Sequence, residues 1–300
     1  MTAMPRRHFL ASLAVCAGAA ESHPKIDAHH HFWNYNPKEY PWISEPEIKG
    51  NFGPQELKAE ITRVGVQGSI PVQARSSLKE TDWLLDLADR YDFILGVVGW
   101  LPVGDTALPE LLERYQSRPK LRGIRTGVQL GGPAERLSRF EGGLRLLSRA
   151  GLSFDLLISE GQLPDAIALV DRFPDLTFVI NHLAKPRIRE RVISPWRENI
   201  REAAKRSNLY CKLSGLVNAA DYRTWTGQDL RPYIDIALAA FGPKRLMFGS
   251  DWPVCLVAAS YERWFNTARL AVAALSSDEQ DWIRGRTAAL AYRLPSSGTT

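Results

Sequence analysis

The chain has 300 residues, a length that fits one large domain or two small ones. Hydrophobic residues make up 45% of it, and with nine tryptophans they can fill a large core. It carries 38 Lys and Arg against 33 Asp and Glu, a formal net charge of +5. Both signs are mixed along the chain without a basic stripe, which argues against a nucleic-acid partner.

The first twenty residues predict an export signal that is cleaved. Arg6 and Arg7 precede an apolar run of small residues, and Ala17-Gly18-Ala19 offers a cleavage site. The string Arg6-Arg7-His8-Phe9-Leu10 is typical of twin-arginine signals, which export folded proteins. We expect residues 1–20 to be removed and the mature protein to be periplasmic, with no membrane partner. An uncleaved basic start is the alternative.

The rest of the chain repeats one pattern, in which a short β-rich apolar run is followed by an amphipathic helical stretch. Eight runs predict strands, at residues 25–31, 68–73, 93–100, 121–126, 152–158, 177–182, 208–214 and 245–251. Helical patterns between them lie at 78–91, 107–116, 140–150, 163–173, 195–205 and 230–241. This alternation predicts an α/β fold, a single (β/α)₈ TIM-type barrel over residues 24–295. A doubly wound open sheet is less favoured, because no Gly-rich phosphate loop follows the first strand.

The first predicted strand ends in a His-x-His pair. Side chains alternate along a strand, which predicts that Asp27, His29 and His31 share one face and that Ala28 and His30 take the other. Two imidazoles at a strand end can hold a metal ion or polarise a carbonyl group.

Barrel enzymes place their chemistry at the carboxyl ends of the strands, and further polar residues lie at these ends. His182 follows the sixth strand and Asp251 the eighth. A carboxylate at the end of an apolar strand must be paired or used, although Asp251 can also cap a helix. The mature chain retains Cys211 and Cys255, which we expect to be buried free thiols, with a single bridge as the alternative.

Several strings resemble the amidohydrolase superfamily, of the amidohydrolase-2 type, and within it the L-fuconolactonase and 2-pyrone-4,6-dicarboxylate lactonase branch. They run in order along most of the chain: Asp27-Ala28-His29-His30-His31-Phe32-Trp33, Tyr40-Pro41-Trp42-Ile43, Arg122-Gly123-Ile124-Arg125, Asn181-His182-Leu183-Ala184-Lys185-Pro186, Lys212-Leu213-Ser214-Gly215 and Phe248-Gly249-Ser250-Asp251-Trp252-Pro253-Val254-Cys255.

The resemblance implies a barrel hydrolase that opens the ring of a sugar lactone such as L-fuconolactone or L-rhamnonolactone. It implies that Asp251 activates water and that His29, His31 and His182 face the lactone. The fifth strand has no histidine and the fourth ends in Arg125-Thr126, which argues against a two-metal centre. We expect either no metal or one divalent ion, zinc, held by His29, His31 and Asp251, with His182 as a further candidate ligand.

Arg125 and Lys185 are suited to bind a substrate carboxylate or hydroxyl groups. Trp33, Trp100 and Trp252 can stack on a sugar ring or pack in the core, and the sequence leaves this choice open. Two other functions stay open: a mononuclear metal-dependent decarboxylase or C–C hydrolase, and a sugar-acid binding protein without catalysis. The oligomeric state is also open.

Overall fold

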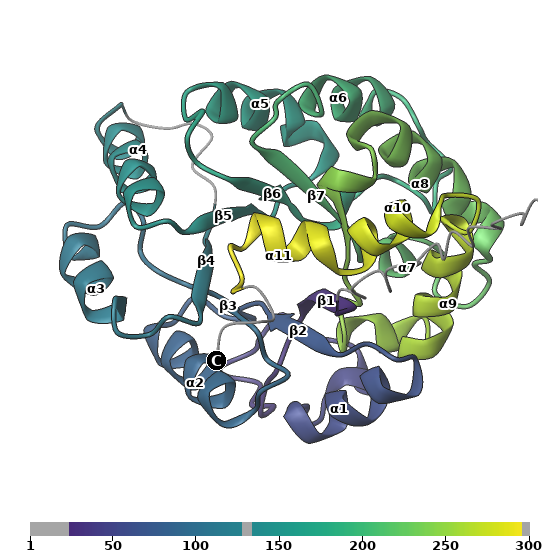
Figure 1. Ribbon diagram of the computed structural model, residues 1–300, viewed down its shortest axis with the longest axis horizontal. Helices are drawn as coiled ribbons and strands as arrows, with labels where there is room; N and C mark the ends of the chain where they lie inside the picture. Colours follow the sequence, from purple (N-terminus) through teal and green to yellow (C-terminus); the bar gives the residue numbers. More distant parts are fainter. Residues whose placement is uncertain (1–23, 128–133, 296–300) are drawn as a thin grey trace, which may run out of the picture.

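The computed structural model describes residues 24–127 and 134–295, so the expected export signal lies outside the described residues. These residues form an α/β fold in which parallel strands alternate with helices. Figure 1 shows the strands at the centre and most of the helices around them. The fold is consistent with a TIM-type barrel, and all eight predicted strands are confirmed, each shorter than predicted.

The strands are β1 (Ile26–His30), β2 (Gly68–Pro71), β3 (Val97–Gly99), β4 (Leu121–Arg125), β5 (Ser153–Leu156), β6 (Phe178–Ile180), β7 (Leu209–Leu213) and β8 (Leu246–Phe248). The α-helices are α1 (Pro54–Arg63), α2 (Leu78–Arg90), α3 (Leu108–Tyr115), α4 (Ala134–Arg149), α5 (Leu163–Asp171), α6 (Trp196–Ala203), α7 (Leu216–Ala219), α8 (Gly227–Phe241), α9 (Tyr261–Ala271), α10 (Ser277–Asp281) and α11 (Thr287–Ala291).

The strands pair as a two-stranded sheet, β1-β2, and a six-stranded sheet that runs in order from β3 to β8. Backbone hydrogen bonds join the two sheets at both edges. Gln73 N, after β2, donates to Val98 O of β3 (2.8 Å). At the other edge, His31 N donates to Trp252 O (2.6 Å), next to β1 and β8 respectively.

The first strand departs from the simple alternation that the sequence predicts. The pairing of β1 with β2 changes register between Asp27 and His30. The Asp27 carboxylate accepts a hydrogen bond from Tyr261 Oη of α9 (3.1 Å), whereas His29 contacts Lys212 of β7. The prediction that Asp27 and His29 share one face is therefore wrong, because the irregular pairing rotates the chain between them.

The last helices cross one end of the strands, as Figure 1 shows for α10 and α11. This is the end where the strands begin, since Ser153 Oγ at the start of β5 donates to Ala291 O (2.6 Å). Gly285 lies so close to Pro24 that an added Cβ would collide with the Pro24 carbonyl oxygen. Tyr292 packs among Val179, Met247 and other inward-facing residues. Because these helices cover the end where the strands begin, a functional site can form at the carboxyl ends of the strands.

Cys211 and Cys255 are buried free thiols, as expected, and burial raises the pKa of both. None of the described helices is both long enough and apolar enough to cross a membrane.

The burial of an uncharged His30 in the first strand can be tested. It is fully buried beside Phe32 (ring centroids 4.6 Å apart), and neither ring nitrogen has a hydrogen-bond partner among the described residues. Burial holds its pKa well below 6.5, so below that pH the unfolded chain binds a proton that the folded chain does not. We expect His30→Leu to reduce the loss of unfolding free energy between pH 6.5 and 5 by about 1.4 kcal/mol per pH unit.

Urea unfolding at several pH values measures this difference. At pH 7.5 the variant should be as stable as the wild type or more stable, because two unpaired polar atoms are removed. An unchanged pH dependence would show that His30 becomes charged in the folded protein.

Candidate active site

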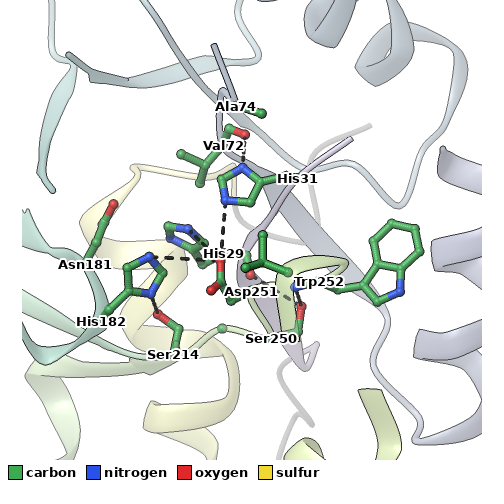
Figure 2. Close-up of polar contacts among 12 residues, drawn as sticks. His29, His31, Val72, Ala74, Asn181, His182, Ser214, Ser250, Asp251 and Trp252 are labelled. Carbon is green, nitrogen blue, oxygen red and sulfur yellow. Dashed lines mark hydrogen bonds and ion pairs between the residues drawn. The ribbon is translucent and has the colours of Figure 1, made fainter. Parts of the chain in front are cut away.

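Three histidines converge on one oxygen of Asp251 at the carboxyl ends of the strands (Figure 2). From Oδ1 of Asp251, the Nε2 atoms lie 3.4 Å away in His31, 3.6 Å in His29 and 4.0 Å in His182. His29 and His31 come from the end of β1, His182 follows β6, and Asp251 follows β8. The structure thus brings together the four predicted catalytic residues from three strand ends.

Two of these residues have left-handed backbone conformations. Asp251 has φ of 57° and His182 has φ of 55°, and Leu183, Ala184 and Lys185 continue the left-handed turn. Such a conformation costs about 1–2 kcal/mol for a residue with a side chain. Tertiary hydrogen bonds hold both turns: Asp251 N donates to His29 O (2.7 Å), and Trp196 Nε1 donates to Leu183 O (2.7 Å). Strain held in this way is typical of functional positions.

In two of the histidines, Nδ1, the ring nitrogen that faces away from Asp251, has a well-defined partner (Figure 2). His31 Nδ1 lies 2.7 Å from Val72 O, and since a carbonyl only accepts, this nitrogen carries a proton. His182 Nδ1 lies 2.9 Å from Ser214 Oγ, a hydroxyl that can donate to it. These contacts fix both rings with Nε2 toward Asp251.

The electrostatics favour an Asp251 carboxylate that faces a neutral His182. Burial by itself raises the pKa of Asp251, but His182, His31 and the Arg125 guanidinium together hold it below its ordinary value. Burial lowers the pKa of His182 to about 4, with Asp251 opposing that shift. At neutral pH, therefore, Asp251 can accept a proton while His182 is uncharged.

A cavity of about 750 Å³ opens above this cluster, which is large enough for a sugar-sized ligand. His31, His182 and Asp251 line it, but His29 does not, since its side chain is fully buried. The expectation that His29 faces the substrate is therefore corrected: it lies behind Asp251, where the register change of β1 places it.

Both predicted cationic residues, Arg125 and Lys185, line the cavity. Arg125 is buried, donates from Nη2 to Gln73 O and from Nη1 to Asn181 Oδ1 (3.3 Å), and has no partner at Nε among the described residues. Lys185, at the end of the left-handed turn, is exposed at the cavity wall. These two groups give the wall donors for an anionic or hydroxylated ligand.

The three predicted tryptophans do not line the cavity. Trp33 and Trp252 are buried in apolar clusters and Trp100 is half-buried, so core packing is the correct alternative for the first two. Trp42 lines the cavity instead: 45% of it is exposed, and its Nε1 donates to Ala74 O (2.9 Å). Sequence reasoning missed Trp42 because it lies outside any strand end, although the string that contains it was already part of the resemblance.

A family model described as "Amidohydrolase" matches residues 26–294. The chain belongs to the amidohydrolase family. This amidohydrolase is 38% identical over 288 residues to L-fucono-1,5-lactonase of Burkholderia multivorans, which covers 90% of this chain and 96% of that protein. The resemblance predicted from the strings is thereby confirmed.

Solved structures agree with this assignment. An amidohydrolase from Burkholderia multivorans with bound zinc is 36% identical, with a TM-score of 0.84 over 91% of this chain and all of the other. A probable 2-pyrone-4,6-dicarboxylic acid hydrolase from Acinetobacter baumannii shares the fold, at 17% identity and a TM-score of 0.71 over 90% of this chain and 99% of the other.

The described residues contain one group with the spacing of a metal site: His29, His182 and Asp251, whose donor atoms lie within 4.8 Å of one another. His182, the further candidate ligand, belongs to this group, whereas the expected His31 does not. The spacing suits a single ion, but the surroundings of His29 do not. A ligating histidine donates from its other nitrogen to an acceptor. In His29 that nitrogen lies 3.2 Å from Nζ of Lys212, a donor.

The protonation of His182 is directly testable. In protein freed of metal by chelation, we expect its ring to titrate near pH 4. Asp251→Asn should lower this pKa further, because the carboxylate that favours the imidazolium is removed. NMR of ring-labelled histidine measures both values, with His182→Gln to identify the resonance. A wild-type midpoint above pH 6, or a rise in the Asp251→Asn variant, would contradict the electrostatics described above.

Proposed function

We propose that this amidohydrolase opens the ring of a sugar-acid lactone by direct attack of water. The observation that carries the proposal is the Asp251 carboxylate, placed among histidines on the floor of a sugar-sized cavity with a cationic wall. The 38% identity to an L-fucono-1,5-lactonase over nearly the whole chain supports the same chemistry. We also propose that the eight strands close as a barrel, supported by the backbone hydrogen bonds at both sheet edges.

In the proposed reaction, Asp251 acts as the general base. Its carboxylate takes one proton from a water molecule as the water oxygen bonds to the lactone carbonyl carbon. The ring C–O bond then breaks, and the protonated Asp251 returns that proton to the departing alkoxide oxygen. The product is an open hydroxy acid, and Asp251 is a carboxylate again. The step needs no covalent nucleophile and no co-reactant other than water.

His182 is the proposed donor to the carbonyl oxygen. In this proposal Ser214 donates to His182 Nδ1, so that the neutral ring carries its proton on Nε2, on the side of Asp251 and the cavity. Negative charge develops on the carbonyl oxygen as water adds, and a donor already in place stabilises it. Nε of Arg125, which lacks a partner among the described residues, lies in the same wall and supplies a positive charge.

Asp251→Asn tests the base. The amide cannot accept the proton, so we expect kcat for the best substrate among sugar lactones to fall by about 100-fold or more. A pH-indicator assay over a set of aldonolactones measures turnover, and thermal unfolding checks that the nearly isosteric variant folds normally. Turnover within about threefold of the wild type would exclude Asp251 as the base.

Trp42 tests how the sugar is held. Its exposed face lies at the cavity wall, so we expect Trp42→Ala to raise KM by about tenfold with little change in kcat, since stacking supports ground state and transition state equally. Tyr222→Ala is the matched control, because Tyr222 is 41% exposed but does not line the cavity. Equal effects of the two substitutions would contradict a stacking role.

A further inference from the structure

Lys212 lies beneath the site, and the proposed reaction does not use it. It is fully buried on β7, where its Nζ donates to Asp155 Oδ2 of β5 (2.7 Å) and contacts His29 Nδ1 (3.2 Å). A buried ammonium is very costly unless it is paired and hydrogen-bonded. The burial of Lys212 therefore needs a physical explanation. Its contact with His29 connects it to Asp251.

Asp155 pairs with Lys212 and holds it in one place. The Asp155 carboxylate also accepts hydrogen bonds from Asn181 Nδ2 (2.8 Å) and Tyr292 Oη (2.8 Å). Burial lowers the pKa of Lys212, but the Asp155 carboxylate opposes that shift and favours the ammonium. The Tyr292 ring centroid lies 5.2 Å from Nζ and adds a cation–π contact from the segment that follows α11.

The contact between Lys212 and His29 determines which nitrogen of His29 carries the proton. An ammonium has three hydrogens and no acceptor, so it can only donate, and His29 Nδ1 must receive with its lone pair. A neutral imidazole has a single N–H, which in His29 is then on Nε2. This atom is buried, has no hydrogen-bond partner among the described residues, and lies 3.6 Å from Asp251 Oδ1.

We propose that Lys212 is a positioning residue that fixes His29 with its proton on Nε2, so that this N–H faces Asp251 and His29 does not serve zinc as a ligand. The N–H groups point in one direction, from Lys212 to His29 and on toward Asp251. His31 differs, because its Nδ1 donates to Val72 O.

The test replaces the buried pair together, in the variant Lys212→Met/Asp155→Asn. Methionine matches the length of lysine without a donor, and the second change avoids an unpaired buried carboxylate. Because one positive and one negative charge are removed, the net charge of the site does not change. Tyr292→Phe is the matched control: it removes a donor to Asp155 but leaves the contact between Lys212 and His29.

Two readouts need no catalytic assay. In chelated protein at pH 7.5, ¹⁵N NMR of the histidine rings should show His29 protonated on Nε2 in the wild type and in Tyr292→Phe, with the proton moved at least partly to Nδ1 in the paired variant. His29→Gln identifies the resonance. Zinc affinity, measured by competition with a chelating dye, should rise by about tenfold or more in the paired variant alone.

Wild-type His29 protonated on Nδ1 would overturn the proposal, and this measurement needs no variant to fold. Equal zinc affinity in the wild type and a folded paired variant would also overturn it. A third readout rests on the proposed function: with a lactone that the protein hydrolyses, the paired variant should lose kcat more than it changes KM. If no lactone is hydrolysed but the NMR and zinc results hold, the proposed function fails and the role of Lys212 stands.

Discussion

The site depends on the backbone contact between β1 and the segment after β8. Asp251 N donates to His29 O (2.7 Å) and His31 N donates to Trp252 O (2.6 Å), so residues more than two hundred positions apart are held side by side. The buried Asp27 carboxylate strengthens this contact by accepting from Ser250 N (2.8 Å). Without it, the carboxylate and the histidines of β1 would lie on separate edges of the sheet.

The backbone of the site is strained at two turns. Asp251 adopts a left-handed conformation in the turn that follows the contact, and His182 begins a similar turn after β6. Each turn directs a side chain inward that regular strand geometry would not place there. The cost is offset by hydrogen bonds from distant segments, such as Trp196 Nε1 to Leu183 O. Strain and function therefore occur together at two strand ends.

The three histidines differ in their surroundings because their Nδ1 atoms meet different groups. His31 faces a carbonyl, His182 a hydroxyl and His29 an ammonium. These partners are the basis for the different roles that we propose for His182, toward a substrate, and for His29, behind Asp251. Tyr292, at the end where the strands begin, hydrogen-bonds to the buried Asp155–Lys212 pair. The pair belongs to the core, and it also contacts the site through Lys212.

The sequence by itself determined the eight strands, because strand periodicity is a local property, and its strings indicated the family. The convergence of His29, His31, His182 and Asp251 was predicted from their places at the strand ends of a barrel. The roles of individual side chains depended on tertiary structure. The register change in β1 buried His29, packing removed Trp33 and Trp252 from the cavity, and a loop outside the strands supplied Trp42. Lys212 contacts a histidine of another strand. No local sequence pattern predicts which nitrogen of that histidine the lysine will contact.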